Sequence, residues 1–257
     1  MTVETHVPAA RERVADEREA VRAKLAAYDD FVDRVRDVST GGTGGEAPSS
    51  VGTTLAATTR QRGGCAAVRE AFDTTVRGVD GVDDDESVFE TLAAELGEEI
   101  AVALAPTTGS ALTPQYREQV IEAATDRRWQ LRTMATALER EAAALDAASE
   151  AFAALREWLI EADETPLTAL GFDDLRERHA RLGDHIDRCE AQARERQAFL
   201  DGSTSEHAKV GLGHRCLVSF LYSDLPVEYP VLDGVATAVA TCKRCRRNVR
   251  AQLTRCA

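Results

Sequence analysis

Aromatic side chains, lysine and long apolar runs are scarce in this sequence of 257 residues. Only 5% of the residues are aromatic although 44% are hydrophobic, so the core must consist largely of small and aliphatic side chains, which suit packed helices better than a β-sandwich. No apolar run approaches the roughly 18 residues of a membrane span. The N-terminus also lacks the apolar stretch of a secretion signal. We therefore expect an all-α, cytoplasmic protein with no membrane partner.

Lysine occurs only at positions 24, 209 and 243, whereas arginine is abundant, and the net charge is −13. Carboxylates keep a protein surface hydrated in high salt, and arginine keeps a bidentate pairing geometry that lysine lacks. A GC-rich genome also favours arginine and alanine, but it does not explain the negative charge. The composition therefore predicts the salt-adapted cytosol of a haloarchaeon.

Apolar residues recur every seven positions near the N-terminus, which predicts a helix over residues 1–38 with one buried stripe. The members of this stripe are Val7, Val14, Val21, Tyr28 and Val35. The glycine- and serine-rich segment 39–50 is expected to be a linker. Two weaker helical stretches follow within residues 51–105, and the second carries apolar residues from Phe89 to Leu104.

The clearest predicted helix begins at Thr113-Pro114, an N-cap followed by proline at the first helical position. Its heptad consists of Leu131, Leu138, Leu145, Phe152 and Leu159, while Glu141 is the one polar member of the companion seam. A second heptad run returns through Leu175, Leu182 and Cys189. Because the connection between the two runs is short, the helices must be antiparallel. The fold class we expect is an all-α, elongated helical bundle over 51–201, built on a long coiled-coil-like hairpin at 114–200.

Residues 202–257 are expected to form a small helical C-terminal cap with a basic last helix. Within it, the segment from Phe220 to Leu232 contains Pro226 and Pro230, which exclude a helix between them. This segment, the Cys242-Lys243-Arg244-Cys245 sequence and the basic helix resemble a family of uncharacterised haloarchaeal all-helical proteins of unknown function. The resemblance lies mainly in residues 217–257. It implies an all-helical fold and a lineage, and it implies no chemistry.

The pair Cys242 and Cys245 has the spacing of metal-binding cysteines. Cytosolic thiols stay reduced, and zinc would need two further ligands, for which His214 and Cys216 are the best candidates. The alternative is packing, because Cys242 falls on the apolar stripe of the last helix and free cysteine is a commonly buried residue. We favour packing and expect no cofactor, with zinc as the open alternative.

Residues 242–257 contain six basic side chains and no acid, on a protein that is acidic elsewhere. The six are Lys243, Arg244, Arg246, Arg247, Arg250 and Arg255. They could meet nucleic-acid phosphate, or an acidic face of the same protein or of a partner. No aromatic residue lies among the arginines to stack on bases. We favour pairing within the protein or with a partner over nucleic acid.

Motifs for catalysis are missing from the sequence: there is no Glu-x-x-His, no Gly-x-Ser-x-Gly and no phosphate-binding glycine loop. We therefore expect no enzyme. The predicted function is a non-catalytic helical scaffold or protein-interaction protein, which meets a partner or a second copy of itself through its heptad seams. The alternative is a nucleic-acid-associated regulator that uses the basic C-terminal helix, with or without a structural zinc site.

Overall fold

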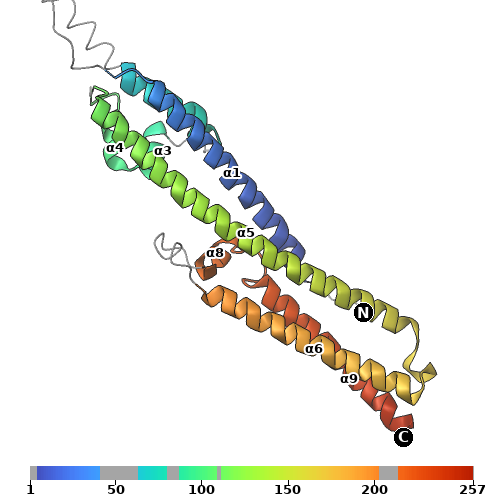
Figure 1. The fold of residues 1–257 in the computed structure, drawn as a ribbon. Helices are drawn as coiled ribbons and strands as arrows, with labels where there is room; N and C mark the ends of the chain where they lie inside the picture. Colours follow the sequence, from blue (N-terminus) through green and yellow to red (C-terminus); the bar gives the residue numbers. More distant parts are fainter. Residues whose placement is uncertain (1–4, 41–62, 80–86, 109–110, 203–213, 257) are drawn as a thin grey trace, which may run out of the picture. The chain divides into compact units, whose positions relative to one another are not determined.

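The computed structural model describes residues 5–40, 63–79, 87–108, 111–202 and 214–256, and all the regular structure in these ranges is helical. The chain divides into two compact units: unit 1 is Met1–Glu17 with Ala137–Ala257, and unit 2 is Arg18–Thr136. Helix α1 (Val7–Asp37) and helix α5 (Pro114–Glu164) contribute residues to both units (Figure 1). The predicted linker 39–50 lies outside the described residues from position 41 onward. The segment boundaries expected from composition stay predictions.

Unit 2 combines the later part of α1 and the early part of α5 with shorter helices between them. These are a helix over 63–72 that continues into the π-helical segment η1 (Asp73–Arg77), then α3 (Val88–Leu96) and α4 (Glu98–Leu104). Its core contains an edge-to-face series of three aromatic rings, with Phe31 packed against Tyr28 and Phe72 at ring-centroid distances of 6.5 and 5.6 Å. These rings hold α1 against the helical segment that includes Phe72.

The sequence pattern predicted one helix running from Phe89 to Leu104, and the structure corrects this. Gly97 has a φ of +98°, a backbone conformation that residues other than glycine rarely adopt. Helix α3 ends at this glycine and α4 begins after it. At the other end of α3, Ser87 and Glu90 cap the helix reciprocally. Phe89 is 42% exposed and does not join the predicted stripe.

Helix α5 runs unbroken for 51 residues, as its heptads predict (Figure 1). The hydroxyl of Thr113 accepts a hydrogen bond of 3.1 Å from the backbone N–H of Tyr116, which is the expected N-cap. All five residues of the main heptad, from Leu131 to Leu159, are at most 7% exposed. Burial of this stripe is the main reason that so long a helix is stable, because helices gain most of their stability from packing.

Unit 1 contains the later part of α5, the short helix η2 (Leu167–Ala169), α6 (Phe172–Asp201), α8 (His214–Leu221) and α9 (Pro230–Cys256). Residues 222–229 are not helical, and α9 starts at Pro230, as the two prolines predict. Helices α6 and α9 lie side by side along much of their lengths (Figure 1). Periodicity within single helices did not identify this pairing.

A glycine permits close packing of α9 on α5. A Cβ atom at Gly234 would lie 2.7 Å from Cε2 of Phe152, nearer than side chains tolerate.

No helix in the described ranges is both long and apolar enough to cross a membrane.

Candidate functional site

The six basic residues predicted to form an interaction patch are all exposed on α9; we call them the basic stripe. Two of them contact α6: Lys243 Nζ lies 3.9 Å from a carboxylate oxygen of Glu190, and Arg246 Nε donates a 3.2 Å hydrogen bond to Nε2 of His179. Both side chains of the Lys243–Glu190 pair are more than half exposed, so this ion pair adds little stability. Most donors of the basic stripe therefore remain on the surface.

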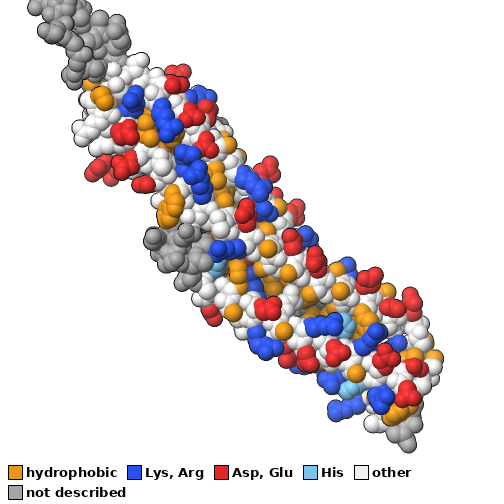
Figure 2. Space-filling view, in the orientation of Figure 1, with side chains coloured by type: hydrophobic (Ala, Val, Ile, Leu, Met, Phe, Trp, Pro, Cys, Tyr) orange, Lys and Arg blue, Asp and Glu red, His pale blue; other side chains and the backbone are white. Residues whose placement is uncertain are grey.

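His179 is the acceptor beneath the basic stripe. Burial lowers the pKa of His179, and the positive charges of Arg246 and Arg250 lower it further. The imidazole therefore stays neutral near pH 7 and accepts the hydrogen bond from Arg246. Acidic and basic side chains are interspersed over the face shown in Figure 2, which suits local pairing of this kind.

The four candidate zinc ligands are not gathered into a site. Among the described residues, no group of three or more His, Cys, Asp or Glu side chains could hold a metal ion. Cys216 is exposed and Cys245 is half-buried, whereas Cys242 is fully buried. His214 is buried and stacks on the ring of Phe199 at a centroid distance of 4.5 Å. Zinc therefore gains no support from this geometry.

The thiol of Cys242 is in an environment that keeps it protonated. Burial, followed by the nearby thiols of Cys189 and Cys245, raises the pKa of Cys242 to about 12. Burial also raises the pKa of Cys189 and of Cys245. A thiolate is the form that binds metal and attacks electrophiles. These cysteines accordingly have the properties of packing residues.

The most deeply buried charges of unit 1 form a cluster that the sequence analysis missed. Arg196 donates hydrogen bonds of 2.8 and 2.7 Å to the two carboxylate oxygens of Glu141, and the hydroxyl of Tyr222 donates one of 2.5 Å to the same carboxylate. All three residues are at most 4% exposed. We call Glu141, Arg196 and Tyr222 the buried triad; it joins α5, α6 and the residue that directly follows α8.

Aromatic contacts extend the buried triad toward α8. The guanidinium carbon of Arg196 lies 5.2 Å from the ring centroid of Phe199, a cation–π contact, and the other ring contact of Phe199 is to His214. Burial, together with the negative charge of Glu141, raises the pKa of Tyr222. The phenol therefore stays protonated and acts as a hydrogen-bond donor.

A signal for the buried triad was present in the heptads. Glu141 was recognised as the polar member of its seam, and Arg196 lies seven positions after Cys189, on the seam that continues from Leu175. A polar residue on each of two facing seams is a pattern that predicts an ion pair across them.

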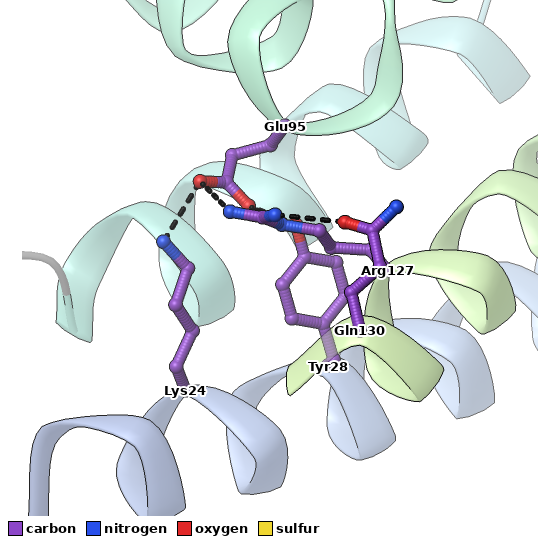
Figure 3. Close-up of polar contacts among 5 residues, drawn as sticks. All are labelled: Lys24, Tyr28, Glu95, Arg127 and Gln130. Atoms are coloured by element: carbon purple, nitrogen blue, oxygen red, sulfur yellow. Dashed lines mark hydrogen bonds and ion pairs between the residues drawn. The ribbon is translucent and has the colours of Figure 1, made fainter. Parts of the chain in front are cut away.

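Unit 2 has a polar cluster of its own around Glu95 (Figure 3). The carboxylate of Glu95 accepts hydrogen bonds from Lys24 (2.8 Å), Tyr28 (2.6 Å) and Arg127 (2.9 and 3.3 Å). Arg127 also donates to the side-chain oxygen of Gln130 at 3.0 Å. We call these five residues the Glu95 cluster; they connect α1, α3 and α5.

The hydrogen bonds of the Glu95 cluster set its ionisation. Burial by itself raises the pKa of Glu95, but the hydrogen bonds from Arg127, Lys24 and Tyr28 outweigh it and lower the pKa to about 2. A carboxylate with so low a pKa is a poor general base near pH 7. The carboxylates of Glu95, which is half-buried, and of Glu141, which is buried, are thus occupied by the protein's own donors, which is the arrangement of structural ion pairs.

Comparison with known proteins gives a family and no activity. Neither the curated proteins nor the solved structures contain a significant match to the chain. A family described as "Domain of unknown function (DUF7260)" matches residues 5–246, which include the buried triad, the Glu95 cluster and the first part of the basic stripe. The chain therefore belongs to the DUF7260 family of domains of unknown function.

Proposed function

We propose that this protein is a non-catalytic helical scaffold that binds another protein chain, either a second copy of itself or a different partner. The observation that carries the proposal is that two carboxylates in the interior of the described helices, Glu95 and Glu141, already accept hydrogen bonds from the protein's own side chains. Glu95 accepts from three side chains and Glu141 from two. A catalytic carboxylate must be free to contact substrate, whereas the carboxylates of Glu95 and Glu141 are both engaged by the protein's own donors.

Exposed aromatic side chains support a role in binding. Trp129 in unit 2 is 43% exposed, and Phe172 and Phe220 in unit 1 are 51% and 57% exposed. Large aromatic side chains are enriched at the centres of protein–protein interfaces, where they contribute much of the binding energy. Phe89 in unit 2 is 42% exposed as well. In a chain with so few aromatic residues, these four exposed side chains of the described ranges are good candidates for contacts with a partner.

The finer architecture that we propose is an antiparallel, coiled-coil-like hairpin formed by α5 and α6. Three contacts support it: Glu141 with Arg196, the rings of Trp158 and His185 at 4.8 Å, and the carbonyl of Thr165 with Arg178. Position numbers rise along α5 while they fall along α6, as expected of antiparallel helices. Such a hairpin would give a rigid support for exposed side chains.

The setting that we propose is the salt-adapted cytosol of a haloarchaeon. The excess of acidic side chains and the near-absence of lysine support it. Thermal unfolding measured from dilute buffer to molar potassium chloride tests this setting. We expect the midpoint to rise with salt as repulsion among the carboxylates is screened; a midpoint that falls steadily would contradict it.

Light scattering coupled to size-exclusion chromatography, in molar potassium chloride and over a range of concentrations, tests self-association. We expect a mass above the 27.8 kDa of one chain. Replacement of the exposed aromatics Phe172 and Phe220 by serine should return the mass toward one chain. A single-chain mass at every concentration would exclude self-association, and the bound protein would then have to be a different chain.

The second candidate function is that of a nucleic-acid-associated regulator, and the exposed basic stripe favours it. Fluorescence anisotropy with a labelled DNA duplex tests it at several salt concentrations. Substituting Arg246, Arg247 and Arg250 by alanine should abolish binding if the basic stripe meets phosphate. The exposed arginines Arg132, Arg140 and Arg156 provide a matched triple control. Binding that is equal in both variants, or absent near native salt, would exclude this candidate.

A further inference from the structure

A cavity of about 120 Å³ lies in unit 1, between the end of α5, the start of α6 and the later part of α9. Its apolar wall comes from Trp158, Leu159, Pro166, Leu167, Leu182 and Val249. A few polar groups also line it, among them Asn248 and Arg178. A mostly apolar cavity with few polar groups is the usual form of a small-molecule site.

A wider and more polar compartment of about 370 Å³ adjoins this cavity. The two share Trp158, Ala162, Thr165 and Arg178 as walls. The charged side chains of the outer compartment are Glu161, Glu164, Asp174, Glu177, Arg178 and Arg181. We call the two compartments together the hairpin-end pocket.

The charges of the hairpin-end pocket favour a cation. Four carboxylates face two guanidinium groups in the outer compartment. Arg178 already donates a hydrogen bond of 3.2 Å to the carbonyl of Thr165, and Arg181 lies 3.8 Å from a carboxylate oxygen of Glu177. Asp174 in turn accepts a hydrogen bond of 3.3 Å from the backbone N–H of Gly171. Because four carboxylates stand against two guanidinium groups, the outer compartment keeps an excess of negative charge whichever of them pair with one another.

Trp158 is positioned to add to this preference, because its side chain lines both compartments. Its ring packs against His185 with an interplanar angle of 40°, which fixes the orientation of the indole. The face of a tryptophan attracts cations more strongly than the face of any other aromatic side chain. An ammonium group in the outer compartment would therefore meet both carboxylates and an indole.

We propose that the hairpin-end pocket binds a small organic cation: an ammonium group in the outer compartment, carried on an apolar body in the inner one. An apolar cavity of about 150 Å³ is sufficient for benzene. The inner compartment, at about 120 Å³, is smaller by itself, but it adjoins the outer compartment of about 370 Å³, so the two together have room for a small ring or a branched aliphatic chain that carries an ammonium group. This proposal is independent of the scaffold role, since no partner protein enters it.

Calorimetric titration of the full chain with three probes tests the ligand class. The probes are phenethylammonium, phenethyl alcohol and phenylacetate, which share a ring and differ in charge. We expect phenethylammonium to bind most tightly and phenylacetate least, with the difference shrinking as salt screens the outer carboxylates. Emission of Trp158, measured in a Trp129→Phe background, should shift with the same affinity. No binding of phenethylammonium, or equal affinity for all three probes, would overturn the proposal.

Charge variants test whether phenethylammonium binds in the hairpin-end pocket. Glu161→Gln with Glu177→Gln should weaken phenethylammonium binding by roughly two- to fivefold for each charge removed, and should leave phenethyl alcohol unaffected. Glu150→Gln with Glu195→Gln, at exposed positions of the same helices that do not line the pocket, is the matched control. A loss of affinity that is equal in both pairs would overturn the proposal.

A second variant obstructs the inner compartment. Ala162→Leu projects into the pocket, whereas Ala147→Leu adds the same side chain at an exposed site of α5. We expect only the change at position 162 to reduce the affinity for phenethylammonium and phenethyl alcohol together. If Ala162→Leu fails to fold, the charge variants, which lie on the surface, still decide the outcome. Unaltered binding by a folded Ala162→Leu protein would contradict the proposed site.

Discussion

Arg196 of α6 and Glu141 of α5 form a bidentate ion pair in which both side chains are at most 4% exposed. Bringing two charges out of water costs several kcal/mol for each ion, so such a pair adds little net stability compared with apolar residues of the same size. Its value is specificity, because only one register of α6 against α5 places the guanidinium opposite the carboxylate. We infer that the buried triad selects this register.

Arg196→Met should destabilise the protein by about 3–5 kcal/mol, since it leaves the carboxylate of Glu141 buried without its charge partner. Denaturant unfolding measures the loss. Replacing all three polar residues, by Glu141→Leu, Arg196→Met and Tyr222→Phe together, should recover most of the stability because no buried polar group is left unpaired. The exposed Arg188 provides a control; if Arg188→Met costs as much as Arg196→Met, the buried triad has no special role.

The ionisation of Glu95 makes the free energy of unfolding depend on pH in the acid range. Its pKa is about 2 in the folded protein and near 4.5 when exposed, so the folded state binds fewer protons between these values. The resulting stability, about 3 kcal/mol, is fully present above pH 5 and is lost as the pH falls from about 4.5 to 2. Unfolding free energies of the wild type and of Glu95→Gln, measured across that range, should converge at low pH. Glu99→Gln, at an exposed position, should keep the wild-type slope; a Glu95→Gln protein with that same slope would refute the assignment.

Gly234→Ala tests the close packing of α9 on α5. The new Cβ would lie 2.7 Å from the Phe152 ring, and such overpacking costs about 1–3 kcal/mol, more than the roughly 1 kcal/mol that alanine gains in a helix. We expect lower thermal stability. Gly183→Ala on α6 is the counterpart, since its Cβ would meet nothing nearer than 3.8 Å, and it should stabilise by up to about 1 kcal/mol. Equal shifts in both variants would contradict the close approach of Gly234 to Phe152.

The thiols should differ sharply in reactivity. Cys216 is exposed, whereas Cys242 is buried with a pKa raised to about 12, so only roughly one Cys242 in ten thousand is a thiolate at pH 8. Alkylation of the native protein, resolved by mass spectrometry, should label Cys216 quickly and Cys242 barely at all. In denaturant the two should react alike. Fast labelling of native Cys242 would show an accessible thiolate and would reopen a metal-binding role.

Heptad spacing was sufficient to predict the long helices, because burial of one stripe imposes a period that is visible within a single segment. It could not show that α9 lies along α6, since periodicity identifies a buried face and not its neighbour. The burial of Arg196 was not predicted for a related reason. A charged residue at a heptad position indicates that the apolar stripe ends there, unless its ion-pair partner, here Glu141, is known to lie opposite it.

Local spacing carried limited information about sites. Cys242 and Cys245 have the spacing of a metal-binding pair. This spacing does not tell whether His214 and Cys216 lie near them in the folded protein, and the structure brings no three of the four residues together as a metal site. The hairpin-end pocket is formed by the connection between α5 and α6 together with the later part of α9, which is distant in the chain, so no local sequence motif predicts it. By contrast, Gly97 could have been read as a helix break.

Site-specific photo-cross-linking in the cells that produce the protein tests the scaffold role most directly. A photoreactive amino acid replaces Phe172 or Phe220 in the full chain, with Glu150, an exposed position on α5, as the control. We expect adducts with one defined protein chain, either this protein or a partner, from positions 172 or 220 and not from 150. No adduct from either aromatic position, or the same adducts from all three, would contradict it.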